Sequence, residues 1–273
     1  MKIKRQICTT WSKEQITILN KYNIDVKEDF ECIYIEENEI YFELEPYFNK
    51  WDVFNVQGIE FSKEEILKAD YCIITGCYEG GYPMPDDDFG YRELTYNMNI
   101  YCQSCGMIKV QKDAFRLKKV PKHKIFKLTW IWDEIFVQLD IYRNIFEPLG
   151  IKCKDVKLFK GDKVIPNIVQ LIIPNTDEPL DLHEYSSQTC LTCGKIKYET
   201  KVNGFYPIQK NPLPHLYRSK EYFGDGCSSD RKIFISGKLR DILIREKIMR
   251  YYWFVPCVGT PLPPARADLQ SVR

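Results

Sequence analysis

The sequence contains no long hydrophobic run. No window approaches the roughly 18 consecutive apolar residues that a membrane-spanning helix needs. The N-terminal segment MKIKRQICTTWSKEQ has positive charges but no apolar region after them, so it does not match a secretory signal. We therefore expect a protein without a membrane span, located in the cytoplasm.

The sequence also lacks an excess of positive or negative charge, and it lacks the common catalytic motifs. The formal net charge is +1, so no overall field attracts the chain to nucleic acid or to a membrane surface. The three histidines, His123, His183 and His215, are far apart in the chain and form no H-x-x-H or H-E-x-x-H motif. A G-x-S-x-G motif and a phosphate-binding P-loop are absent too. The sequence therefore predicts a protein that is not an enzyme.

The overall composition is typical of a globular protein whose surface is suited to binding. The 273 residues are 44% hydrophobic and 28% charged, which is enough apolar material for a substantial core. Aromatic residues make up 14% of the chain. Tyrosine and tryptophan are enriched at protein interfaces, so this content favours a binding role.

Local patterns predict a mixture of helices and strands. Capping boxes at Ser12 and Ser62 predict helices over about 13–22 and 63–69. The segment ECIYIEENEIYFELEP alternates between apolar and polar residues, which predicts two strands around a turn at Glu37–Asn38. Apolar residues at helical intervals predict a helix over 133–146, and Ser236 is expected to cap another. YCIITG and YYWFVPC are expected to be strands.

These elements predict a single α+β domain over residues 1–257. The final segment, 258–273, is rich in proline and lacks apolar periodicity, so we expect a disordered tail there.

The eleven cysteines include a repeated pattern. An odd number in a long chain argues against a disulfide framework. The pattern C-x-x-C-G occurs as CQSCG at 102–106 and as CLTCG at 190–194. A tetrahedral Zn²⁺ site needs four ligands, and two such knuckles supply Cys102, Cys105, Cys190 and Cys193. The glycine after each pair lets the backbone adopt a positive φ close to the sulfurs.

The site predicted from these knuckles is a structural zinc ribbon closed across an insertion. Residues 107–189 would form a folded α/β insertion within the 102–194 ribbon segment, because the free energy of loop closure grows slowly with length. Four cysteine ligands leave no open coordination position, so the metal would stabilise the fold. Each pair alone would also suit a redox couple or buried thiols. We expect Cys72, Cys77, Cys227 and Cys257 to be free thiols rather than a second metal site.

Two charged segments are candidate binding surfaces. Asp86, Asp87 and Asp88 lie between Tyr82 and Tyr91, and acidic groups beside aromatics suit the docking of a basic protein partner. A solvated loop would also account for them. The lysines from Lys109 to Lys124 would be the solvated face of strands or a contact for phosphate.

The two knuckles and the segment YRSKEYFGDGCSSDRKIFISGKLRDILIREKIMRYYWFVPC, at 217–257, resemble the double-CXXCG-motif family of bacterial polymorphic-toxin immunity proteins. The resemblance runs from roughly residue 50 to 257 and rests on the four cysteines and this C-terminal block. It implies a non-catalytic protein that binds and neutralises a cognate toxin protein. The alternative is a zinc-ribbon protein that binds nucleic acid, which the near-neutral charge disfavours. The sequence does not indicate the oligomeric state.

Overall fold

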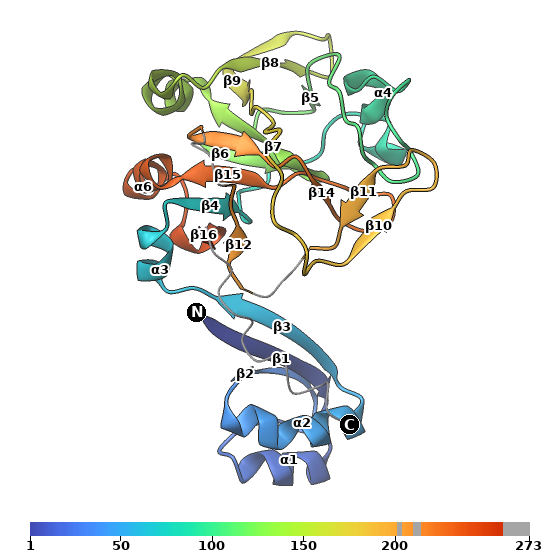
Figure 1. The fold of residues 1–273 in the computed structure, drawn as a ribbon, viewed down its shortest axis with the longest axis vertical. Helices are drawn as coiled ribbons and strands as arrows, with labels where there is room; N and C mark the ends of the chain where they lie inside the picture. The colour runs from blue at the N-terminus through green and yellow to red at the C-terminus, as the bar shows by residue number, and fades with distance from the viewer. Residues whose placement is uncertain (201–203, 210–213, 259–273) are drawn as a thin grey trace. The chain divides into compact units, whose positions relative to one another are not determined.

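The computed structural model describes residues 1–200, 204–209 and 214–258 (Figure 1). It is a mixed α+β protein, as expected. A single domain over 1–257 was expected, and the described residues pack as two compact units: Met1–Glu65 with Gly204, and Ile66–Thr200 with Phe205–Gln209 and residues 214–258. The expected tail falls outside the described residues apart from Val258, which belongs to a strand.

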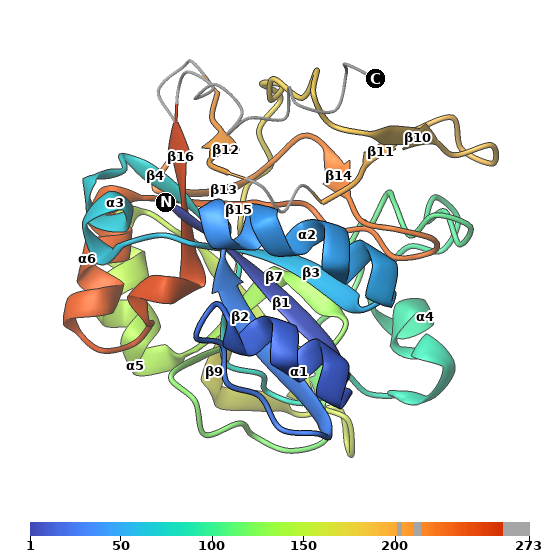
Figure 2. The ribbon, with the colours of Figure 1, turned by 90° about the horizontal axis from the view of Figure 1, so that it is seen from below.

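The first unit is a three-stranded antiparallel sheet in the order β2-β1-β3. Its elements are β1 Lys2–Thr10, α1 Lys13–Asn20, β2 Phe30–Glu36, α2 Glu39–Trp51 and β3 Phe54–Glu60. Both helices lie on the same side of the sheet (Figures 1 and 2). Ile7, Trp11 and Leu19 are fully buried in the core between them. The predicted capping box at Ser12 is confirmed at the start of α1.

The first of the two strands predicted around Glu37–Asn38 is confirmed as β2, but the second is wrong, because the segment after β2 is a helix. The side-chain Oδ1 of Asn38 caps α2 by accepting the backbone N–H groups of its second and third residues, at 3.1 and 3.3 Å. Tyr41, Leu44 and Phe48 are buried at intervals of three and four, whereas Ile40 is 40% exposed. The helical period of the larger apolar residues therefore decides the structure, not the short alternation.

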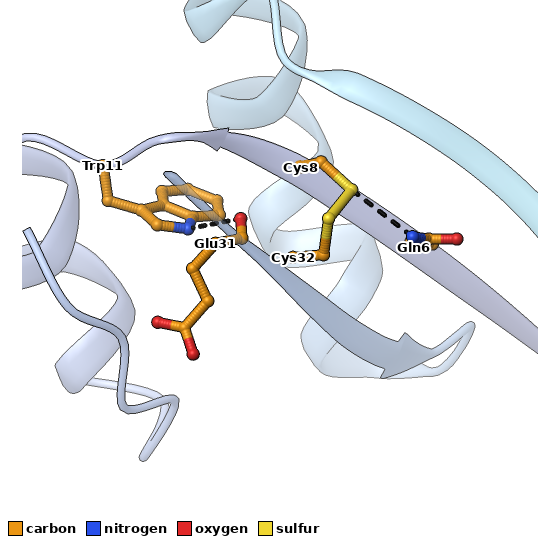
Figure 3. The surroundings of a disulfide bond; sticks show 5 residues. All are labelled: Gln6, Cys8, Trp11, Glu31 and Cys32. Atoms are coloured by element: carbon orange, nitrogen blue, oxygen red, sulfur yellow. Dashed lines mark hydrogen bonds between the residues drawn. A yellow bond between two sulfur atoms is a disulfide. The ribbon is translucent and has the colours of Figure 1, made fainter. Parts of the chain in front are cut away.

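A disulfide joins Cys8 in β1 to Cys32 in β2 (Figure 3). The two residues are directly opposite in the antiparallel register, with Cα atoms 4.1 Å apart. The Gln6 side chain donates to Cys8 Sγ at 3.5 Å, and the Trp11 indole N–H donates to the Glu31 carbonyl at 3.1 Å. The sequence argued against a disulfide framework, and this bond departs from that expectation. Strand register brings them together, and chain spacing does not reveal register.

The second unit is built around three sheets. They are ordered β12-β16-β4-β15-β13, β5-β8-β9-β7-β6 and β10-β11-β14. The strands are β4 Tyr71–Ile74, β5 Arg116–Leu117, β6 Ile125–Leu128, β7 Ile131–Gln138, β8 Cys153–Leu158, β9 Val164–Leu171, β10 Ser187–Thr189, β11 Ile196–Tyr198, β12 Tyr206–Pro207, β13 Leu216–Arg218, β14 Tyr222–Phe223, β15 Ile233–Ser236 and β16 Phe254–Val258.

The helical segments are short. They are α3 Lys63–Lys68 (which crosses the boundary between the units), η1 Asp87–Phe89, α4 Tyr91–Thr95, α5 Leu139–Ile141, η2 Tyr142–Phe146, η3 Glu147–Leu149, α6 Gly237–Arg245 and η4 Tyr251–Trp253. The predicted caps are confirmed: Ser62 Oγ accepts from the third residue of its helix at 3.1 Å, and Ser236 Oγ does so at 3.4 Å. The expected strands at YCIITG and YYWFVPC correspond to β4 and β16.

The chain between the two knuckles folds around its own five-stranded sheet, which contains β5 to β9. The predicted helix over 133–146 is wrong in its first half, because β7 continues to Gln138 and helical structure begins at Leu139. Ile135, Phe136 and Val137 are consecutive and fully buried, so both faces of β7 are covered here. A strand buried on both faces has no alternation, so its apolar run also fits a helical period.

Candidate metal centre

The four knuckle cysteines form one cluster, although residues 106–189 separate the two pairs in the chain. The sulfurs of Cys102, Cys105, Cys190 and Cys193 all lie within 4.8 Å of one another. Cys102 Sγ is 3.8 Å from Cys190 Sγ, and Cys105 Sγ is 3.7 Å from Cys193 Sγ. A tetrahedron with metal–sulfur bonds of about 2.3 Å has edges of about 3.8 Å, so these two separations suit a single ion. The four cysteines can therefore hold a metal ion with little movement of their side chains.

The two knuckles have the same backbone structure. In the first, the Cys102 N–H donates to the Met107 carbonyl at 3.1 Å, and the Gly106 N–H donates to the Cys102 carbonyl at 2.8 Å. In the second, the Cys190 N–H donates to the Lys195 carbonyl at 2.9 Å, and the Gly194 N–H donates to the Cys190 carbonyl at 2.8 Å. The two five-letter repeats therefore fold into two equivalent halves of one site.

The sulfur pairing follows this equivalence. The sulfurs of the two first cysteines are 3.8 Å apart, and those of the two second cysteines are 3.7 Å apart. Thr192 Oγ1 also donates to Ser104 Oγ at 3.0 Å, and these residues occupy the same position in their knuckles. The halves are therefore related by an approximate two-fold axis through the cluster, which is how two identical turns can present four ligands to one ion.

The surroundings of the two halves differ. Around the first knuckle, Met107 is fully buried, and the Ile108 N–H donates to Tyr222 Oη at 3.2 Å. A Cβ added to Gly106 would lie 2.4 Å from the Cys227 carbonyl oxygen, so the backbone of residues 227–229 covers this turn. A Cβ added to Gly194 would meet nothing within 4 Å. The first knuckle is part of the core and the second is at the surface.

The pKa of the Cys190 thiol is shifted in the opposite direction from those of Cys105 and Cys193. The backbone N–H groups of Cys193 and Thr192 point at Cys190 Sγ and lower the pKa of Cys190 to about 6. Burial raises the pKa of Cys105 to about 12, and burial also raises the pKa of Cys193. A cation at the centre would favour the thiolate form of all four, so metal binding would release protons from the two thiols whose pKa is raised, Cys105 and Cys193.

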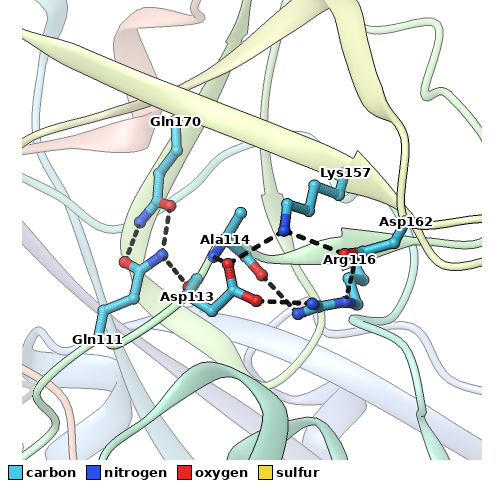
Figure 4. A network of polar contacts seen from close by, with 7 residues as sticks. All are labelled: Gln111, Asp113, Ala114, Arg116, Lys157, Asp162 and Gln170. Atoms are coloured by element: carbon cyan, nitrogen blue, oxygen red, sulfur yellow. Dashed lines mark hydrogen bonds and ion pairs between the residues drawn. The ribbon is translucent and has the colours of Figure 1, made fainter.

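A polar network fixes the chain that follows the first knuckle to the sheet of the insertion (Figure 4). The side-chain amides of Gln111 and Gln170 exchange two hydrogen bonds, at 3.0 and 2.9 Å. Asp113 pairs with Arg116 at 2.6 Å and with Lys157 at 3.3 Å. The Arg116 guanidinium lowers the pKa of Asp113 to about 2. This network connects the first knuckle to β8 and β9.

Lys109 belongs to the interior and not to a basic surface. Its Nζ lies 2.6 Å from Asp230 and 3.2 Å from Asp133, and its side chain is 12% exposed. Burial alone would lower the pKa of Lys109, but the two carboxylates outweigh it and raise that pKa. Neither alternative given for the lysines from Lys109 to Lys124, a solvated strand face or a phosphate contact, therefore holds for Lys109.

The predicted partner-binding residues are only partly at the surface. Tyr82 is 48% exposed, and Asp86, Asp87 and Asp88 are exposed. Tyr91 is 4% exposed and packs edge-on against Tyr96 in the core, so it is unavailable to a partner. It begins the short helix α4, which turns its ring inward.

The cysteines outside the knuckles form no further metal cluster among residues 1–200, 204–209 and 214–258. Cys72 and Cys257 are buried and Cys227 is exposed, all as free thiols, as predicted. Each histidine has separate surroundings: His123 stacks on Tyr78, and His215 Nδ1 lies 2.8 Å from Ser236 Oγ. His183 Nδ1 lies 2.7 Å from Asp181.

Sequence reasoning missed an open apolar face on the first unit. Opposite the helices, β2 and β3 present Phe30, Tyr34, Phe54 and Val56, which are 67%, 67%, 65% and 40% exposed. The register places Tyr34 and Val56 on either side of Gln6. The alternation in β2 was visible in the sequence, but which face the helices would cover was not.

Comparison with known protein families, with curated proteins and with solved structures gives no match to this chain. Across the part of the chain that the structure describes, every helix is too short or too polar to cross a membrane.

Proposed function

We propose that this chain is a non-catalytic bacterial immunity protein that binds a toxin protein and blocks it by occupying its surface. The observation that supports this proposal is the open face of the first unit, defined here as Phe30, Tyr34, Phe54 and Val56. Large exposed aromatics on one rigid surface are the usual anchors of protein interfaces, because they bury much apolar area with little loss of side-chain entropy.

The charges around the open face suggest what kind of partner fits it. Lys2 pairs with Glu36 at 2.8 Å across the sheet, and Lys4 pairs with Glu60. These pairs neutralise one another, so the face offers apolar contact without a net charge at its edge. The complementary surface would be an apolar, aromatic-accepting patch on a folded protein.

We propose that the metal held by the four cysteines is Zn²⁺ and that its role is structural. Four thiolates in a tetrahedral arrangement are a ligand set that zinc favours, and they leave no position for a substrate. The ion would stabilise the second unit by linking the two knuckles and would take no part in a reaction. The site thus supports a binding role for the protein and not a catalytic one.

The acidic loop is a second proposed contact. Asp86, Asp87 and Asp88 are exposed beside Tyr82, and acidic groups at an interface rim mainly increase the rate of association with a basic partner. This loop belongs to the second unit and the open face to the first. A toxin that contacts both would be recognised by one apolar and one electrostatic element.

The test is co-expression with the product of the neighbouring toxin gene in a sensitive host, which we expect the wild type to protect. The double variant Tyr34→Ser/Phe54→Ser should lose protection at equal folded protein level. Its matched control is Ile40→Ser/Phe42→Ser, which removes apolar side chains that are 40% and 53% exposed on the opposite, helical side. The triple Asp→Lys variant at 86–88 should protect more weakly, because it loses the electrostatic attraction that increases the rate of association with a basic partner.

Failure of the wild type to protect against any adjacent gene product would reject the immunity function. Equal protection by the open-face variant and by its control would discard the face and leave the function standing. The proposal places the protein in the bacterial cytoplasm, as the sequence predicted.

A further inference from the structure

A second surface, on the second unit, has a different character. Between residues 114 and 132 the sequence has no acidic residue, and Lys118, Lys119, Lys122 and Lys124 are all exposed. The other cations of this segment are already engaged: Arg116 pairs with Asp113 and Asp162, and Lys127 is buried. The loop 118–124 therefore concentrates four exposed positive charges in a protein whose net charge is only +1.

An aromatic ledge from distant parts of the chain lies against this loop. His123 stacks on Tyr78 with ring centroids 4.3 Å apart and planes 5° apart. Tyr78 in turn contacts the Trp253 ring edge-on at 4.7 Å. A Cβ on Gly76 would lie 2.2 Å from Trp253 Cδ1, so the indole packs directly on the backbone of residue 76. Ring contacts through Tyr78 thus connect His123 of the loop to Trp253.

The outer edge of this ledge is cationic and planar. Arg250 is exposed, and its guanidinium lies 5.7 Å from the ring centroids of both Tyr252 and Trp253. Tyr252 is 53% exposed, and the Arg250 side chain donates a hydrogen bond to its hydroxyl. Residues 247–258 contain no acidic residue. Arg250 and Tyr252 thus add a positive charge and an exposed aromatic ring to the four lysines.

We propose that this basic–aromatic surface, the loop 118–124 together with Arg250 and Tyr252, binds single-stranded nucleic acid. The lysines would contact successive phosphates, and a base would stack on the Tyr252 ring beside the Arg250 guanidinium. Single strands fit better than a duplex, because only unpaired bases offer their faces to an aromatic side chain. An acidic protein would meet the same charges, and the comparison with poly-glutamate below distinguishes it from a single strand.

This activity is separate from toxin binding, since it uses neither the open face nor the acidic loop. Fluorescence anisotropy with the metal-loaded full chain and fluorescein-labelled oligo-dT of 15 nucleotides tests it directly. We expect saturable binding that weakens as salt rises, and weaker binding to the matching duplex. The slope of log affinity against log salt should fall by about 0.7 for each phosphate-contacting lysine removed.

The informative pair of variants removes the same number of charges from two places. Lys122→Ala/Lys124→Ala should weaken binding about tenfold at low salt and reduce the slope by about 1.4. Lys160→Ala/Lys163→Ala, which changes two exposed lysines around the β8–β9 turn, should leave both nearly unchanged. Tyr252→Ala should weaken binding roughly tenfold while the slope stays the same, because stacking releases no counterions. Circular dichroism and metal content confirm that each variant is folded.

Each remaining result would overturn the proposal. These are no binding at low salt, equal loss in the loop variant and its control, tighter binding to duplex than to single strand, and equal binding to poly-glutamate. The last result would assign the surface to an acidic protein instead.

Discussion

Single residues decide how the two halves of the metal centre differ. Gly106 and Gly194 occupy equivalent positions with φ of 74° and 70°, a region in which an L side chain costs about 1–2 kcal/mol. Only at Gly106 would a Cβ also meet backbone, 2.4 Å from the Cys227 carbonyl. The equivalence of the two turns is therefore conformational and does not extend to their packing.

Substituting the two glycines should separate these effects. Gly194→Ala should lower the free energy of unfolding by about 1–2 kcal/mol, from the backbone alone. Gly106→Ala should cost roughly twice as much, because the segment at 227–229 must also shift and overpacking adds about 1–3 kcal/mol. Urea denaturation of the zinc-loaded proteins measures both. Equal losses would mean that the 227–229 segment moves freely.

The cysteines allow a similarly matched test of the metal ligands. Cys105→Ser should reduce bound zinc from one per chain to nearly none and destabilise the second unit by several kcal/mol, since metal binding is coupled to folding. Cys227→Ser is the control, because its backbone covers the first knuckle while its sulfur lies outside the cluster. Metal analysis of protein kept reduced gives the answer. Zinc retained by Cys105→Ser would contradict the four-ligand site.

At the scale of secondary-structure elements, two braces, a disulfide and an ion-pair network, each hold two segments of the chain together. The disulfide between Cys8 and Cys32 joins β1 to β2 and closes a segment with a sequence separation of 24, for which a stabilisation of about 3 kcal/mol is expected. The Asp113 network fixes the chain beyond the first knuckle to β8. Each brace responds to a different solution condition.

Reduction should loosen the first unit selectively. A reductant should increase hydrogen exchange in β1 and β2, because the two strands lose their cross-link, and should leave β7 and β9 unchanged. The double variant Cys8→Ser/Cys32→Ser should show the faster exchange from the start and no response to the reductant. Wild-type exchange that is the same with and without reductant would show that the disulfide contributes little. Thiol alkylation with mass spectrometry, applied to protein from its native cells, would show whether the bond forms there.

Acid should remove the second brace. The pKa of Asp113 is lowered from 3.8 to about 2, chiefly by Arg116, so the carboxylate stabilises the fold above pH 3.8 and that contribution is lost as the pH falls through about 2. Because the Asp113 side chain is 38% exposed, we expect only about 1 kcal/mol. Asp113→Asn should be less stable than wild type by this amount at pH 6, and the difference should shrink between pH 4 and 2.

The control for this pH dependence is Asp155→Asn, which changes an exposed carboxylate in β8. Its stability relative to wild type should not vary over the same range. A constant difference for Asp113→Asn would show that the network does not depend on its charge.

The elements also show what the sequence could predict. Capping motifs are local, so Ser12, Ser62 and Ser236 were correctly identified as helix starts. The clustering of the four knuckle cysteines was predicted, because a metal ion requires ligands of a fixed type and spacing. The β7 strand was not, because its period vanishes when both faces are buried. Strand register, and with it the disulfide and the open face, depends on pairings between distant segments that no local pattern encodes.

At the scale of the whole molecule, the two units rely on different stabilising bonds. The disulfide belongs to Met1–Glu65, and all four metal ligands belong to the other unit. The chain should therefore lose its structure in parts and not as one cooperative block.

A chelator should act on one part only. Removing zinc with EDTA should increase hydrogen exchange around the knuckles and in β10 and β11, which flank the second knuckle. Exchange in β1, β2 and β3 should be unaffected, and addition of zinc should restore the original pattern. Loss of protection throughout the chain would show that the units unfold together.

The folded insertion between the knuckles has a consequence for metal affinity. If the 84 residues from 106 to 189 were flexible, bringing the two half-sites together would cost about 4 kcal/mol of chain entropy before the ion gained anything. Folding of the five-stranded sheet already removes this chain entropy before the ion binds. The sheet therefore acts as a rigid linker that gives each half-site a high effective concentration around the other. Damage to this sheet, far from any cysteine, should therefore appear as weaker zinc binding with every ligand intact.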